Sequence, residues 1–305
     1  MKIVTTMLAS LIAPRLYRRL LGTASRAMKL LDESSADAMR AYVEGKFLSC
    51  GAAVDRAGQA DIYYTFFGLG CLRAFDVQAP PEASTFLRDR IDRGGGDFVH
   101  TAALALCAGM VPLGLPRRRA LAAAIETFRT VDGGYGTKEG AACATPYATY
   151  LALLAHGALG LSPANAAQAR QAILPCEQAD GSYVNRRGET AANVTTTAAA
   201  AGVHGICGRR PSRHLLAWVQ SQYSQGGGFR SSPNAPLPDL LSTAVALHTL
   251  RQSRVRLLPE VKRDCLVFVQ DLWQEDGGFA GSIADDLTDC EYTFYALVAL
   301  GALAD

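Results

Sequence analysis

The sequence predicts an all-α fold built from six helix-hairpin repeats. Three observations predict it: a glycine-rich loop ending in an aromatic residue recurs, a helix-capping residue followed by Thr recurs, and the composition favours helices. Of 305 residues, 49% are hydrophobic, only 8% are aromatic and 29 are Gly. Ala- and Leu-rich runs divided by glycines are typical of helices joined by loops.

The glycine-rich loop is the first regular feature. It reads VDGGYG around Tyr135, QADGSY at Tyr183, SQGGGF at Phe229 and QEDGGF at Phe279. The aromatic residues therefore follow one another at intervals of 48, 46 and 50 positions. Self-similarity of this period indicates a repeat architecture in which each unit is one supersecondary element.

The second regular feature is a cap-type residue with Thr four positions later, at the start of an apolar run. The six instances are Asp61 to Thr65, Asp97 to Thr101, Thr145 to Thr149, Asn193 to Thr197, Asp239 to Thr243 and Asp289 to Thr293. Asp, Asn and Thr accept hydrogen bonds from the free N–H groups of a first helical turn. Six repeats of this kind fill the chain from about residue 36 to its last residue.

Each repeat is predicted to contain two helices. An apolar inner helix follows the cap residue, as in DLLSTAVALHTLRQ, and a more amphipathic outer helix begins at Pro or Ser, as in LPEVKRDCLVFVQDLW. The inner helices have little polar stripe, so we expect them to be surrounded on most sides. Stacked helix pairs bury the face that one pair cannot bury alone. An open solenoid and a closed ring both accept six repeats.

The chain is predicted to have two parts, a basic amphipathic segment over residues 1–35 and the repeat domain over 36–305. An apolar run over residues 3–13 precedes the basic residues Arg15, Arg18 and Arg19. This run is too short to span a bilayer and lacks a good signal-peptide cleavage site. Two interpretations stay open: the segment packs against the repeat domain, or it lies on an anionic membrane surface.

Charge and cysteine usage limit the partners and the compartment. Thirty basic and 28 acidic side chains give a formal charge of +2, so no nucleic-acid partner is expected. The 8 cysteines form no CxxC pair. They are expected to be buried thiols of a reducing compartment, so we predict a cytoplasmic protein, membrane-associated if its N-terminal segment binds lipid.

The QEDGGF loop followed by a capped apolar helix resembles the repeat of protein prenyltransferase β-subunits and of squalene and terpene cyclases. Matches to this repeat recur over most of the chain. The resemblance implies an (α/α)6 toroid whose inner helices line an apolar cavity. It also implies a function in handling isoprenoid or similar apolar small molecules.

The resemblance does not extend to the zinc chemistry of the prenyltransferases. Those enzymes bind zinc through an Asp, a Cys two positions later and a His at the next helix head. Asp239 matches the Asp, but Leu241 and Tyr292 stand at the other two positions. Catalytic zinc normally has three protein ligands, so zinc is not expected. Only Arg230 is basic between the preceding loop and Asp239, so a standard diphosphate clamp is not expected either.

Class II terpene cyclases offer a second template, an Asp-x-Asp-Asp-Thr-Ala helix head whose middle acid protonates an alkene or epoxide. In the sixth repeat Glu291 stands at the middle position, between Asp289 and Tyr292. Desolvation beside a second carboxylate would raise the pKa of Glu291, as a general acid requires. We therefore predict a catalytic group of Glu291, Asp289, Asp239 and Tyr292; the alternative is that these acids only cap helices.

Further residues near the helix heads are candidates for substrate binding: Asp61, Tyr64, Arg230, His248 and Tyr295. The cofactor stays undetermined. Mg²⁺ could bind with a diphosphate at Asp285, Asp286 and neighbouring acids, and Asp239, Cys290 and Glu291 form a less conventional metal set. The function predicted is a cavity enzyme for acid-initiated cyclisation or isomerisation. The alternatives are a non-catalytic toroid that binds lipid or protein, and a zinc-less β-subunit-like protein that needs a helical partner.

Overall fold

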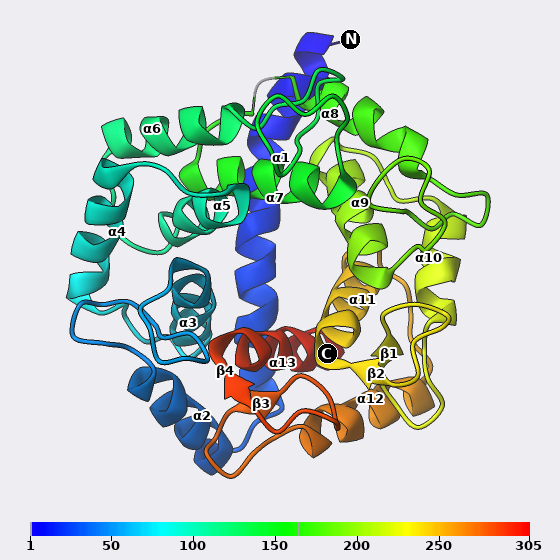
Figure 1. Ribbon diagram of the computed structural model, residues 1–305. Coiled ribbons are helices and arrows are strands. Elements are labelled where there is room, and N and C mark those ends of the chain that lie inside the picture. The colour runs from blue at the N-terminus through cyan, green and yellow to red at the C-terminus, as the bar shows by residue number, and fades with distance from the viewer. Residues whose placement is uncertain (1, 164) are drawn as a thin grey trace. The chain divides into compact units, whose positions relative to one another are not determined.

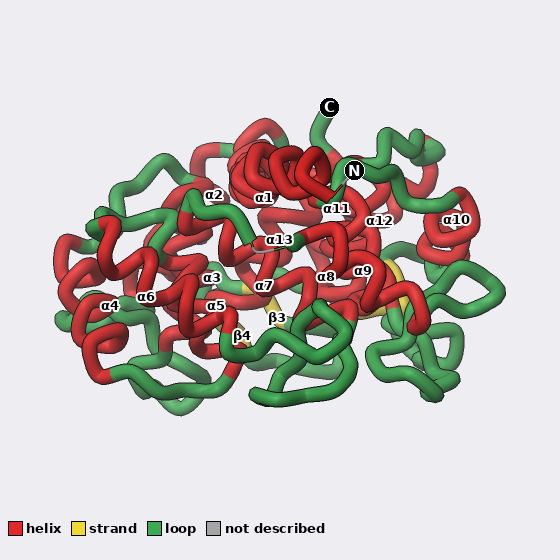
Figure 2. Tube along the Cα trace, turned by 90° about the horizontal axis from the view of Figure 1, so that it is seen from above, coloured by secondary structure: helices red, strands yellow, loops and turns green. Residues whose placement is uncertain are grey.

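The computed structural model describes residues 2–163 and 165–305, with side chains described from residue 13 onward. Helices predominate (Figure 2), and each repeat contributes two of them. Six apolar helices follow the predicted cap residues: α3 (Ile62–Ala74), α5 (Phe98–Cys107), α7 (Pro146–Leu159), α9 (Val194–Ile206), α11 (Leu240–Gln252) and α13 (Cys290–Leu303). Six helices precede them: α2 (Glu33–Gly45), α4 (Pro81–Arg93), α6 (Leu115–Glu126), α8 (Ala166–Ile173), α10 (Arg213–Ser221) and α12 (Pro259–Asp271). The predicted all-α fold is confirmed.

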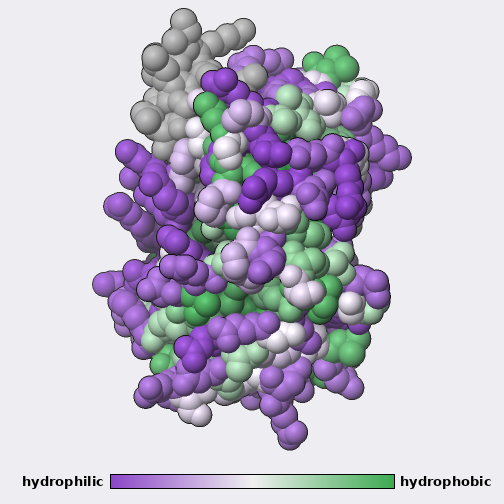
Figure 3. Space-filling model, turned by 90° about the vertical axis from the view of Figure 1, so that its left-hand side faces the viewer, coloured by the Kyte–Doolittle hydropathy of each residue, from purple (hydrophilic) through white to green (hydrophobic). Residues whose placement is uncertain are grey.

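The helices that precede the loops are amphipathic. In α4, for example, Ala83 and Leu87 are buried one turn apart, whereas Arg88, Asp89 and Arg90 are exposed. Figure 3 faces the side on which α4 lies and shows hydrophilic side chains predominating there, with smaller hydrophobic areas between them. These helices therefore contribute one apolar stripe to the core and a charged face to the solvent.

The glycine-rich loops close on themselves and then pair with the following helix head. In each of four loops the aromatic residue forms an antiparallel bridge with the residue six positions earlier, as between Trp273 and Phe279. In the last two repeats the pairing continues as short strands: β1 (Phe229–Arg230) with β2 (Pro238–Asp239), and β3 (Phe279–Ala280) with β4 (Thr288–Asp289). Two-residue strands carry no alternation pattern, so the sequence did not predict them.

In four of the loops one glycine of positive φ lies where a side chain cannot fit: Gly51, Gly181, Gly227 and Gly277. Gly277 has φ 89°, and a Cβ there would lie 2.7 Å from the carbonyl oxygen of Ala38 in α2. Gly51 has φ 82° and meets the backbone N of Ala83 in α4 in the same way. The Gly51 loop was not predicted, because Ala53 stands where the other loops have an aromatic residue. Each of these two loops thus packs against the amphipathic helix of another repeat.

The chain divides into two compact units, one of residues 1–19 and 87–219 and the other of residues 20–86 and 220–305. Within the first unit, α7 packs against α5 and against α9. Within the second unit, α13 lies beside α3 and beside α11 (Figure 1). The first and last repeats are therefore neighbours, although they lie at opposite ends of the sequence.

The N-terminal helix α1 (Lys2–Ser25) continues into the short 3-10 helix η1 (Arg26–Lys29). Its residues Ala13, Tyr17, Leu21 and Ala24 are buried along one stripe, and the Tyr17 hydroxyl donates to the carbonyl of Leu106 at 2.7 Å. One face of the described part of α1 thus packs into the protein. Arg15, Arg18 and Arg19 are exposed, and membrane contact by this segment stays a prediction. Of the helices described, none is both long enough and apolar enough to cross a bilayer.

Candidate functional site

All six predicted cap residues cap an apolar helix. The side chain of each accepts a hydrogen bond from the backbone N–H three residues later: Asp61 from Tyr64, Asp97 from His100, Thr145 from Ala148, Asn193 from Thr196, Asp239 from Ser242 and Asp289 from Tyr292. The cap oxygen satisfies a donor that has no partner within the helix.

The Thr four positions after the cap joins the helix head to the preceding loop. In four repeats its hydroxyl oxygen accepts the N–H of the loop residue that ends the glycine motif: Thr65 from Ala53, Thr149 from Tyr135, Thr197 from Tyr183 and Thr243 from Phe229. Loop and helix head are therefore fixed to each other, and the residues between cap and Thr are held in a defined position.

Close packing of α3 against α13 brings the heads of the first and last repeats together. A Cβ at Gly70 would lie 2.7 Å from the Phe294 ring, so only Gly permits this approach. The Tyr63 and Phe67 rings lie 4.9 Å apart edge to face, and the Phe67 and Tyr295 rings lie 5.5 Å apart. The predicted substrate-binding residue Tyr295 thus belongs to an aromatic cluster that both helices form.

Glu291 lies in the first turn of α13 and faces α3. Its Oε1 accepts a hydrogen bond of 2.6 Å from the Tyr63 hydroxyl. Burial is the main cause that raises the pKa of Glu291 to about 7, and the charge of Asp289 adds to it, whereas the Tyr63 hydrogen bond and Arg56 lower it. A carboxyl of this kind is partly protonated near neutral pH, which suits a general acid.

Asp289 lies in the same helix head but in a different environment. Its Oδ1 accepts the Tyr292 N–H at 2.8 Å, and its Oδ2 accepts the Arg56 Nε–H at 2.7 Å. Arg56 also donates to Asp285 at 3.1 Å and lies 5.4 Å from the centre of the Tyr292 ring. Both oxygens of Asp289 therefore accept N–H donors, one of them on a cationic side chain.

Asp239 and Arg230 lie at the head of the neighbouring helix α11. Both oxygens of Asp239 accept from Ser242, one from its N–H and one from its hydroxyl. Burial raises the pKa of Asp239, and these hydrogen bonds oppose the rise. Arg230 donates to the Ser224 hydroxyl at 3.4 Å, but its buried Nε has no partner among the described residues. Asp239 is thus a cap with its own partner.

The other predicted substrate-binding residues, Tyr64, Asp61 and His248, lie at different distances from the helix heads. Tyr64 faces the acidic pair: burial, and then the charges of Asp289 and Glu291, raise its pKa to about 12. Asp61 caps α3. His248 lies more than two turns along α11 from the cap; its buried Nδ1 has no partner among the described residues, and burial lowers its pKa to about 4. His248 is therefore neutral and remote from the helix head.

Two residues of the site have roles that the sequence did not predict. Tyr63 was not among the predicted catalytic or binding residues, but its hydroxyl is the hydrogen-bond donor to Glu291. Arg56 was not singled out at all, although it contacts two acids more than 220 positions away. It is the only basic residue between Lys46 and Asp61, and the acid-rich last repeat was the signal that a cation should be near.

The residues at the family's zinc positions do not fit a zinc ion. Asp239 is used by Ser242, and Leu241 and Tyr292 supply neither thiolate nor imidazole. Burial raises the pKa of Cys290 to about 12, which disfavours the thiolate that a metal needs. In the described part of the chain, no three His, Cys, Asp or Glu side chains are grouped as metal ligands would be.

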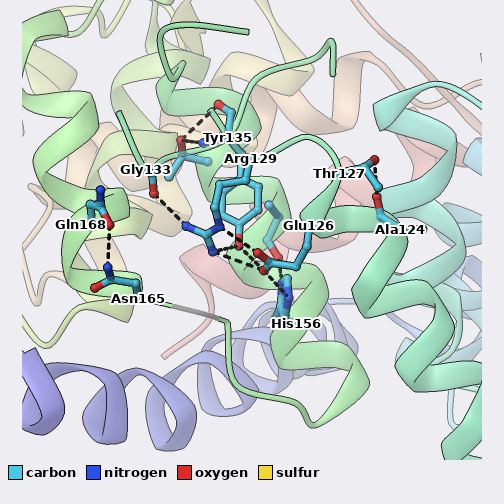
Figure 4. Close-up of polar contacts among 11 residues, drawn as sticks. Ala124, Glu126, Thr127, Arg129, Gly133, Tyr135, His156, Asn165 and Gln168 are labelled. Atoms are coloured by element: carbon cyan, nitrogen blue, oxygen red, sulfur yellow. Dashed lines mark hydrogen bonds and ion pairs between the residues drawn. The ribbon is translucent and has the colours of Figure 1, made fainter. Parts of the chain in front are cut away.

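A second polar cluster lies in the other unit and is shown in Figure 4. Glu126 accepts hydrogen bonds from Arg129, Tyr135 and the His156 ring. Burial opposes its ionisation, but these three partners outweigh burial and lower the pKa of Glu126 to about 2. Glu126 is therefore a fixed anion and no proton donor. This contrast leaves the Glu291 head as the better candidate site.

Six capped apolar helices, each preceded by its own amphipathic helix, define an all-α helix-hairpin repeat protein with an acidic site at one pair of helix heads. Residues 98–210 and 209–305 match the model of the prenyltransferase alpha-alpha toroid domain, which covers more than half of the chain. The chain belongs to this family. No curated protein sequence matches it.

Solved structures with different activities are similar in fold. The type II terpene cyclase MstE from Scytonema, with its product merosterolic acid A, is 14% identical with a TM-score of 0.62, covering 94% of this chain and 97% of that chain. The Candida albicans protein geranylgeranyltransferase-I bound to GGPP is 12% identical with a TM-score of 0.61, over 87% and 90% of the two chains. A glycosidase bound to glucose is 14% identical with a TM-score of 0.52, over 90% and 98%. At such identities the likeness supports the fold, and the activity has to be argued from the site.

Proposed function

We propose that the protein is an enzyme that protonates an alkene or epoxide of a neutral isoprenoid and so starts its cyclisation or isomerisation. The observation that carries the proposal is the Glu291 carboxyl, whose pKa is raised to about 7 beside an aromatic cluster. Its proton forms a C–H bond with the alkene, whose π electrons supply the pair. Loss of a proton from the resulting carbocation then gives an isomer of the substrate.

The surroundings of Glu291 suit this chemistry. The faces of Tyr63, Phe67 and Tyr295 can stabilise a carbocation electrostatically. The acid and the Tyr63 and Tyr295 rings are partly buried, which reduces the access of competing water to such an intermediate. The solved relatives that act on isoprenoids, the terpene cyclase and the geranylgeranyltransferase, agree with an apolar ligand of this class.

The charges at the helix heads favour a neutral substrate over a prenyl diphosphate. The second unit places Asp289, Glu291, Asp285 and Asp239 at these heads, while Arg56 is already shared by two carboxylates. A diphosphate would meet like charges there. Polyprenyl alcohols, epoxides and prenylated phenols are therefore the substrates to test first.

The test incubates the protein with such isoprenoids in D₂O and compares Glu291→Gln with the unchanged protein. An acid that exchanges with solvent should place one deuterium in each product molecule, and Glu291→Gln should lower kcat by about 100-fold or more. Glu260→Gln is the matched control, because Glu260 occupies the same first-turn position of α12. Unchanged turnover in Glu291→Gln would refute the proposal, and tight binding without product in every variant would identify a lipid-binding toroid instead.

A further inference from the structure

We infer that Arg56 is a positioning residue of this site: it holds Asp289 as the anion, so that the exchangeable proton of the helix head stays on Glu291. The inference rests on the proposed function, because it explains which of two adjacent carboxyls is the acid. It concerns a residue of the first repeat acting on the last repeat.

The loop that carries Arg56 is held by other groups. Val54 and Ala60 form an antiparallel bridge at its ends. Inside it, the Asp55 carboxylate accepts the N–H groups of Ala57 and Gln59, each at 2.8 Å. The turn thus forms without the guanidinium, so a substitution of Arg56 should leave the loop in place.

The guanidinium reaches a buried partner. The Asp289 side chain is only 4% exposed, whereas those of Arg56 and Asp285 are 34% and 30% exposed. An ion pair between exposed side chains contributes little, but a buried carboxylate that loses its cation is left with an uncompensated charge. Such a group takes up a proton rather than stay ionised in a dry environment.

The remaining groups around the head do not pair with Asp289. Glu291 faces Tyr63 and Tyr64 of α3, and the charge of Asp239 reaches Tyr292 from α11. From the end of α2, Tyr42 and the cation Lys46 also approach, but the Lys46 ammonium lies over the Tyr42 ring, 4.5 Å from its centre. Among the described residues, Arg56 is the only cation that shifts the pKa of Glu291. Without it, two carboxyls in one head compete for one proton as a coupled pair.

The experiment follows the carboxyl carbons by NMR in protein labelled with ¹³C at Asp and Glu side chains, between about pH 5 and about pH 8. Signals are assigned with Asp289→Asn and Glu291→Gln. In the unchanged protein we expect Glu291 to titrate near 7 and Asp289 to show no step. In Arg56→Gln the carboxyl shift of Asp289 should show a titration step within this pH range. In Arg56→Lys, which keeps a cation at this position, that step should be much smaller.

Two further measurements make the outcome unambiguous. Arg117→Gln, which breaks the exposed Arg117–Asp92 pair of 2.7 Å, should leave both signals unchanged. An unchanged Asp289 signal in folded Arg56→Gln, or the same step in Arg117→Gln, would overturn the inference. Because the readout is a carboxyl signal and not turnover, persistence of turnover in Glu291→Gln would refute the proposed acid without altering this result. In an active enzyme, Arg56→Gln should also shift the pH profile of kcat.

Discussion

Replacing His204 by Gln tests how a buried neutral histidine limits stability in acid. His204 lies in the last turn of α9 and is only 7% exposed. Its Nδ1 accepts the Arg170 Nε–H at 2.9 Å, and its Nε2 lies 3.0 Å from the Tyr183 hydroxyl. Burial and, after it, the charge of Arg170 lower the pKa of His204 to about 4. The folded protein therefore resists protonation of this ring.

The size of the effect follows from linkage. An unfolded histidine titrates near 6.5, so the unfolded chain binds more protons than the folded one between about pH 6.5 and about pH 4. The free energy of unfolding therefore falls as the pH falls through this window, and the contribution of His204 is complete above it. At about 1.4 kcal/mol per pH unit, the loss attributable to His204 is roughly 3 kcal/mol.

The assay measures urea unfolding at a series of pH values. The two Trp residues lie in different units, Trp218 in the first and Trp273 in the second. A Trp273→Phe background makes fluorescence report the unit that contains His204. In that background, His204→Gln should reduce the slope of unfolding free energy against pH by up to about 1.4 kcal/mol per unit. His100→Gln, at an exposed position, is the control.

Equal slopes for His204→Gln and its parent between about pH 4 and about pH 6.5 would refute this reasoning. The ring carbon shifts of His204 give an independent check, because they should show no titration down to about pH 5 in the folded protein. A histidine that titrates near 6.5 while the protein stays folded would show that the Arg170 contact does not hold the ring neutral.

Three other predictions follow from the loops and the acid. Gly226→Ala and Gly227→Ala form a matched pair, since both glycines have positive φ but only a Cβ added at Gly227 would collide with a neighbour, the carbonyl oxygen of Asp264. Urea unfolding should show Gly227→Ala to be worse by about 1–3 kcal/mol, and equal losses would contradict the packing argument. Thr197→Val leaves the buried Tyr183 N–H unpaired, so unfolding free energy should fall by about 1–3 kcal/mol; a loss near zero would show that another group takes this donor. If Glu291 is the acid, kcat should decline as the pH rises through about 7, and a rate that rises there would identify a base instead.

The sequence predicted most of the fold because the fold repeats locally. A cap residue, a Thr four positions later and a glycine-rich loop each act over fewer than 20 residues, so their spacing alone identified the six apolar helices. The loop at Gly51 was missed because Ala53 fills the aromatic position, while the backbone conformation is retained. A sequence pattern identifies recurring residue types, but a loop can keep the same backbone conformation when one of those residue types is replaced.

The site was less predictable because its contacts join the two ends of the sequence. Glu291 and Asp289 could be named from their position in one helix head. That Tyr63 donates to Glu291 and Arg56 to Asp289 depends on the approach of α3 and α13 at Gly70 and Phe294. No spacing along the chain encodes such a contact. Likewise, the sequence placed Asp239 in the predicted catalytic group, but it did not show that Ser242 donates hydrogen bonds to both oxygens of Asp239.

The cap and the Thr of each helix head together determine which residues are free to change. Four heads are anchored to their loops through the Thr hydroxyl, and all six are anchored through the cap. Of the three intervening side chains in each head, the middle one takes no part in these contacts, whereas the third bonds to its cap at His100 and Ser242. In the last repeat these three are Cys290, Glu291 and Tyr292; in the fourth they are Val194, Thr195 and Thr196. The first residue of each triplet is buried, whereas the middle residue is partly exposed in all six heads. New chemistry can therefore arise by exchanging the middle residue, as at Glu291, without redesigning the backbone that presents it.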